Sequence, residues 1–176
     1  MKKHKGFTLI ELLIVIVVMG ILASMMMLSS SESVSTARAS NIISSLRNFS
    51  MAAMAYYTDK MDEFGKNPGY LKDDSDTLTT NVKARMHNEG NIPDVDKYVV
   101  KNNEEDSTNK LYTLWVGYNL ESENSRVKEK LAGRAESAKL CGTGSVNPPE
   151  RGSSTKYTEY NKDHTYVWVL IRSNRR

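Results

Sequence analysis

Glu11 is the only charged residue between Phe7 and Leu28, and almost every residue around it is apolar. A carboxylate inside such a run costs about 2–3 kcal/mol to insert into a lipid bilayer. A simple membrane anchor gains nothing from this charge. We therefore expect Glu11 to be functional and to have a cationic partner.

The apolar run from Phe7 to Leu28 is long enough to cross a hydrocarbon core of about 30 Å, at about 1.5 Å per helical residue. A cleaved secretory signal is one alternative, but its apolar region is usually only about 7–15 residues long. The nearest small-residue site, Ile21-Leu22-Ala23, also has a bulky residue three positions before the cut. An uncleaved anchor is the second alternative, and it leaves Glu11 unexplained.

The segment from Lys5 to Leu13, KGFTLIELL, follows a short basic leader and resembles the N-terminus of type IV pilins and type II secretion pseudopilins. The resemblance implies that prepilin peptidase cuts between Gly6 and Phe7, and that the new amine of Phe7 is N-methylated. Glycine suits the cut because it has no side chain to obstruct an extended backbone in a protease cleft. The resemblance also implies that Glu11 faces the Phe7 amine of a neighbouring subunit, which would offset the cost of the desolvated carboxylate.

Three lysines of the leader, Lys2, Lys3 and Lys5, account for the formal charge of +3. Without them, 21 Lys and Arg residues balance 21 Asp and Glu residues, so the mature chain is formally neutral. The overall charge is therefore no argument for a nucleic-acid partner. Cationic residues beside a first hydrophobic segment keep that end in the cytoplasm, so we expect the rest of the chain on the far side of the membrane.

By resemblance, we expect a single-pass protein of the bacterial inner membrane that is later extracted into a periplasmic or extracellular filament. The expected partners are prepilin peptidase, other pilin or pseudopilin subunits, and an inner-membrane assembly platform with its motor ATPase. A structural filament subunit is the leading hypothesis. The alternative is a membrane-anchored minor pilin that displays its head for adhesion or DNA capture.

The remaining reactive residue types do not assemble into a catalytic pattern, so we expect no enzyme activity. His87 and His164 have no nucleophile nearby in the sequence, and Cys141 is the only cysteine, so no intramolecular disulfide can form. Cys141 is expected to be a small packed residue. Gly142-Thr143-Gly144 is too short for a phosphate-binding loop.

A calcium site is the only cofactor that the sequence suggests. Asp73, Asp74 and Asp76 are carboxylates of the kind that calcium prefers, and major pseudopilins can hold calcium in a head loop. Asp59, Asp62, Asp94 and Asp96 are further candidates. The spacing of these aspartates does not match an EF-hand, and the simplest interpretation is that they are solvated surface charges. We therefore expect the protein to have no cofactor.

A helix must position Glu11, and its pattern continues beyond the apolar run. Apolar residues recur at spacings of four, three, four and three along one helix face: Ile42, Leu46, Phe49, Ala53 and Tyr56. One long helix from Phe7 to about Thr58 is predicted, with its first half in lipid and its second half packed against a head.

The head is predicted to contain a small, mostly antiparallel sheet, which gives an α+β, pilin-like fold. The predicted helices cover 76–88 and 123–140, and the predicted strands cover 98–100, 111–118 and 165–171. The strand order does not follow from these segments. The expected organisation is a leader at 1–6, a transmembrane half-helix at 7–28, an amphipathic half-helix at 29–58 and a globular head at 59–176.

Overall fold

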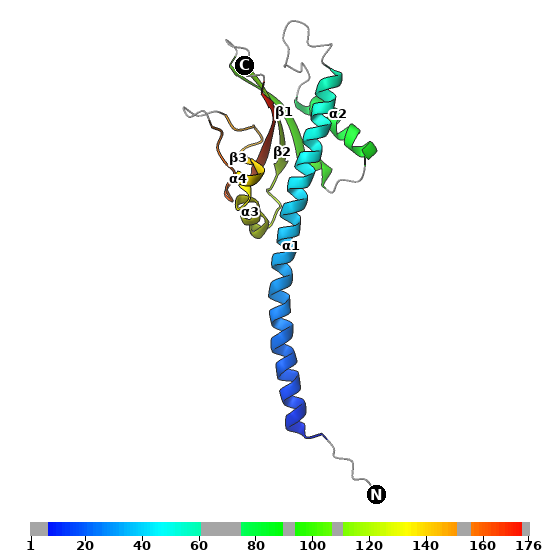
Figure 1. Ribbon diagram of the computed structural model, residues 1–176, viewed down its shortest axis with the longest axis vertical. Helices are drawn as coiled ribbons and strands as arrows, with labels where there is room; N and C mark the ends of the chain where they lie inside the picture. The colour runs from blue at the N-terminus through cyan, green and yellow to red at the C-terminus, as the bar shows by residue number, and fades with distance from the viewer. Residues whose placement is uncertain (1–6, 61–74, 90–93, 107–110, 151–155, 174–176) are drawn as a thin grey trace.

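The computed structural model describes residues 7–60, 75–89, 94–106, 111–150 and 156–173. Helix α1 (Leu9–Asp59) forms a stalk, and the other elements gather around its C-terminal half as a head (Figure 1). The helix has 51 residues and is about 77 Å long at about 1.5 Å per residue. The prediction of one long helix from Phe7 to about Thr58 is confirmed within two residues at each end.

The head is built on one antiparallel sheet of four strands in the order β1-β2-β4-β3. The strands are β1 (Tyr98–Asp106), β2 (Leu111–Asn119), β3 (Cys141–Thr143) and β4 (Tyr166–Ser173). Strand β4, which comes last of the four in the chain, lies between β2 and β3. The predicted α+β class, with a long helix packed on a small antiparallel sheet, is therefore confirmed.

Three helices and a short 3₁₀ turn complete the described head: α2 (Ser75–Glu89), η2 (Val95–Lys97), α3 (Ser125–Ala132) and α4 (Ala135–Ala138). The prediction of one helix over 123–140 is wrong. Gly133 caps the C-terminus of α3, and the chain restarts as the separate α4 after Arg134. Glycine is a weak helix former, and Leu131 and Ala135, on either side of the break, are both buried.

The apolar stripe of α1 forms the centre of the core, as predicted. All five stripe residues are buried, and the ring of Phe49 stacks on that of Tyr98 in β1 with centroids 4.3 Å apart. A second apolar layer lies around Trp115 and Trp168, which are fully buried. Each indole N–H donates to a threonine hydroxyl at 2.9 Å, so burial leaves neither group unsatisfied.

Helix α2 packs along β1, at the edge of the sheet (Figure 1). The Thr79 hydroxyl accepts the backbone N–H of Val100 at 2.9 Å and donates to the carbonyl of the same residue at 3.1 Å. An exposed edge strand would offer such groups to another chain. Thr79 satisfies both groups of Val100, so this point of the edge is closed to strand addition.

Candidate functional site

Thr8 and Glu11 form a capping box at the start of α1. The Thr8 hydroxyl accepts the backbone N–H of Glu11 at 3.3 Å. In return, the Glu11 carboxylate accepts the backbone N–H of Thr8 at 2.8 Å and its hydroxyl at 2.7 Å. The box satisfies N–H groups that the first helical turn leaves without a partner, so Glu11 also has a role within its own subunit.

Both donors from Thr8 reach the same carboxylate oxygen, Oε2 of Glu11. Within the described residues, no donor binds the second oxygen, Oε1, and the side chain is exposed. An ionised carboxylate can accept about four hydrogen bonds. Glu11 therefore keeps acceptor capacity and its negative charge for a group that comes from outside the described part of the subunit.

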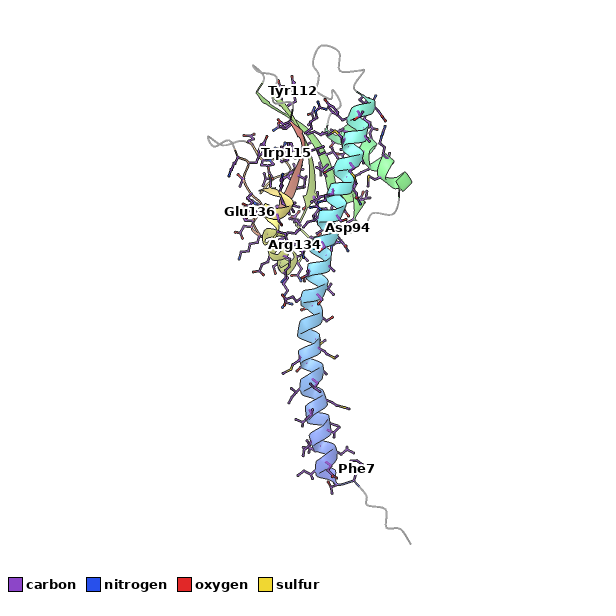
Figure 2. The ribbon with its side chains drawn as sticks, in the orientation of Figure 1. Phe7, Asp94, Tyr112, Trp115, Arg134 and Glu136 are labelled. Atoms are coloured by element: carbon purple, nitrogen blue, oxygen red, sulfur yellow. The ribbon has the colours of Figure 1, made fainter. Side chains whose placement is uncertain are left out.

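The part of α1 from Leu9 to Met27 is largely apolar, and all of its residues are exposed. Its most apolar 18-residue window has a mean hydropathy of 2.7, and none of that window is buried. The exposed large apolar side chains form an almost continuous surface from Phe7 to Met27 (Figure 2). By length and composition, α1 is able to cross a membrane.

Phe7 lies immediately before the capping box, with 85% of its surface exposed (Figure 2). Gly6, the residue on the other side of the predicted cleavage site, lies outside the described residues. The structure thus brings Thr8 together with the predicted site residues Phe7 and Glu11 at one end of an exposed apolar helix. Threonine three positions before glutamate is the sequence signature of a capping box, and it could have predicted the role of Thr8.

A family model, the prokaryotic N-terminal methylation motif, matches residues 1–27. No curated protein and no solved structure matches the chain. The matched segment contains Gly6, Phe7 and Glu11 and covers most of the apolar run. The N-terminus therefore carries the methylation motif that is the signature of type IV pilins and pseudopilins. The motif and the long apolar helix together fit membrane anchoring.

The calcium candidates do not gather into one site within the described part of the chain, where no group of three His, Cys, Asp or Glu side chains could hold a metal ion. Asp59 pairs with Arg85, and Asp94 pairs with Arg38. Asp76 is exposed in the first turn of α2. Three other candidates, Asp62, Asp73 and Asp74, lie outside the described residues.

Cys141 is the first residue of the edge strand β3, and His164 lies against Gly142 of the same strand. Burial raises the pKa of the Cys141 thiol to about 11, so the unreactive thiol form predominates at neutral pH. Nδ1 of His164 accepts the backbone N–H of Asn161 at 3.1 Å, and burial lowers the pKa of the imidazole. These contacts fix a turn of the head and do not activate a nucleophile.

An ion-pair cluster that was not predicted joins α1 to the head. Nη2 of Arg38 donates to Oε1 of Glu123 at 2.7 Å and to the Tyr118 hydroxyl at 3.0 Å, and it also pairs with Asp94. The Tyr118 hydroxyl donates to Glu123 at 2.7 Å, and Nζ of Lys97 lies 3.0 Å from the same carboxylate. We call these five residues the Arg38 cluster.

The Arg38 cluster holds a charged carboxylate that is almost buried, with 7% of the Glu123 side chain exposed. Burial alone would raise its pKa. The hydrogen bonds from Arg38, Tyr118 and Lys97 outweigh that effect and hold the pKa at about 2. The residues of this cluster are up to 85 positions apart, so no local sequence pattern predicts it.

Proposed function

We propose that this protein is a structural subunit of a type IV pilus-like or type II secretion pseudopilus filament, assembled through α1. The observation that carries the proposal is the capping box at the exposed end of an apolar helix, where Glu11 retains a charge and an unused oxygen. The apolar stalk, unpacked by its own head, supplies a surface that lipid or neighbouring stalks can cover.

Cleavage after Gly6 creates the cation that such a Glu11 requires. The new amine of Phe7 would lie one residue before the capping box, at the same end of every subunit. Pairing of this amine with Oε1 of a neighbouring Glu11 would satisfy two charges that are costly inside an apolar environment. The subunit would wait in the inner membrane with its N-terminus in the cytoplasm until an assembly platform extracts it.

The test compares Glu11→Gln with Thr8→Ala and Glu11→Ala in full-length protein expressed with its assembly system. Glutamine still accepts the Thr8 N–H, because capping boxes use Glu or Gln, but it carries no charge. We expect Glu11→Gln and Glu11→Ala to insert and to be processed, and to form filaments poorly. Thr8→Ala keeps the charge and should assemble much better than either.

Intact-mass measurement of each membrane-extracted protein provides the control for processing. The wild type should show loss of residues 1–6 and gain of one methyl group. An unprocessed wild type, or normal filament yield from Glu11→Gln, would contradict the proposal. Chemical crosslinking addresses the alternative of a displayed adhesion or DNA-capture module, because a bulk filament subunit gives long ladders and a display protein does not.

A further inference from the structure

A groove of about 300 Å³ lies between α1 and α4 in the head. Arg134 lines it, and its Nη1 donates to the Ser40 hydroxyl at 2.6 Å. From Ser40 to Arg47, α1 forms about 10 Å of the groove wall at about 1.5 Å per residue. The lining residues are Ser40, Ile43, Ser44, Arg47, Arg134, Ser137 and Ala138.

Both charged residues of the groove are arginines, and neither forms an ion pair within the described residues. Arg47 is exposed, while Arg134 is partly buried and bonded to a neutral hydroxyl. A second groove, beside Glu32 of α1, contains two acidic and two basic residues, and Glu32 pairs there with Lys130 at 2.6 Å. Of these two grooves, the one lined by Arg47 and Arg134 therefore offers unpaired positive charge to a negatively charged group.

Glu136, in α4 and two residues after Arg134, provides a carboxylate of opposite charge. It is exposed, forms no ion pair within the described chain, and does not line the groove. In Figure 2, Arg134 lies nearer to α1 than Glu136 does. A carboxylate and its receptor groove on different faces of one subunit cannot meet within that subunit, but they can meet between two copies.

The positions of Glu136 and of the groove along α1 are compatible with the proposed pairing of Glu11 with the Phe7 amine of a neighbour. A pairing of Glu11 with the Phe7 amine of a neighbour shifts two parallel copies by about four residues, or about 6 Å. The groove extends about 10 Å along α1, and α4 lies beside it. A neighbour shifted by this amount still brings Glu136 to the level of the groove.

We propose that the Glu136 carboxylate of a second copy of this chain binds in the groove between Arg47 and Arg134, an inference that rests on the proposed filament function. The contact joins two different surfaces, so it repeats from copy to copy without closing into a symmetric pair. Two guanidinium groups around one carboxylate also fix the register of neighbouring heads.

The test is charge reversal on each side of the contact in full-length protein. Glu136→Arg places a third cation in the groove, and the pair Arg47→Glu with Arg134→Glu places three carboxylates together. Each change should lower the yield of crosslinked ladders about tenfold. The triple variant combines Glu136→Arg with Arg47→Glu and Arg134→Glu, so that opposite charges again face one another. Its yield of crosslinked ladders should return to within about twofold of the wild type. Glu121→Arg makes the same change at another exposed site and should assemble normally.

Two readouts separate failure of the contact from other failures. Emission from buried Trp115 and Trp168 checks that each head is folded, and recovery by the triple variant excludes a folding defect. Wild-type yield from Glu136→Arg, loss in Glu121→Arg equal to that in Glu136→Arg, or no recovery in the triple variant would overturn the groove contact alone. Absence of ladders from the processed wild type would overturn the filament function and the contact together.

Discussion

Replacement of Glu123 by glutamine tests the Arg38 cluster. The change removes the charge but retains the size and one acceptor oxygen of the side chain. Removal of one partner from a buried ion pair usually costs about 3–5 kcal/mol. Arg38 is 28% exposed and also pairs with Asp94, so water and a second carboxylate compensate in part. We therefore expect Glu123→Gln to lower the free energy of unfolding of the head by about 2–3 kcal/mol at pH 7.

The pKa of Glu123 gives an independent check on this magnitude. A fall from the usual value of 4.5 to about 2 corresponds to about 3 kcal/mol before any discount for screening, at about 1.4 kcal/mol per pH unit. Because the pKa is lower in the folded head than in the unfolded chain, the stabilisation is complete above about pH 5. It is lost as the pH falls from there toward 2.

Urea denaturation of the processed protein in detergent measures both effects. The two tryptophans, Trp115 and Trp168, lie in the head, so their fluorescence reports on head unfolding without a signal from the stalk. The stability of Glu123→Gln should fall less steeply than that of the wild type between pH 5 and pH 3. Glu121→Gln, at an exposed position two residues away, is the control and should change little. A loss below about 1 kcal/mol at pH 7, with parallel pH profiles, would refute the reasoning.

Two further predictions concern packing in the head. Thr79→Val leaves the Val100 N–H without its acceptor and should cost about 1–2 kcal/mol in the same urea assay, with faster hydrogen exchange of that amide; unchanged exchange would contradict it. Gly117→Ala places a methyl group 2.5 Å from ring carbons of Trp168 and should cost about 1–3 kcal/mol with altered tryptophan emission. Wild-type stability and emission would show that the ring can shift freely.

The sequence predicts the elements that show a clear local pattern of apolar residues, such as α1 and β2. The stripe from Ile42 to Tyr56 reveals the buried face of α1 because a helix repeats it every three or four residues. The β2 segment (Leu111–Asn119) is rich in aromatic and β-branched residues, and its prediction over 111–118 agrees within one residue.

Strands β1 and β3 depend on pairing with neighbouring strands, and the sequence alone does not predict their extent. The prediction for β1 stopped at Val100, because the strand continues through polar residues that pair with β2 at the edge of the sheet. Strand β3 was missed altogether, since Cys141–Thr143 is too short to show a period and forms against β4. The strand order likewise depends on which strands pair across long connections, and the sequence of a single strand does not show its partner.

The site shows the same division. Phe7 and Glu11 are predicted from a family resemblance carried by neighbouring residues, and both lie at the start of α1. Arg38 and Glu123 meet only after the head has folded around α1, and Arg134 meets Ser40 for the same reason. Contacts across such distances in sequence follow from tertiary packing, which one sequence does not specify by pattern.

The central position of β4 has a consequence for the order in which the protein can be made. The chain leaves the ribosome from its N-terminus, so β1, β2 and β3 emerge before Tyr166. Until residues 166–173 follow, β2 lacks one neighbour and β3 has no strand to pair with. The stalk can enter a membrane early, whereas the sheet of the head closes only when β4 arrives. A premature stop before Tyr166 would therefore leave an anchored stalk whose head cannot close.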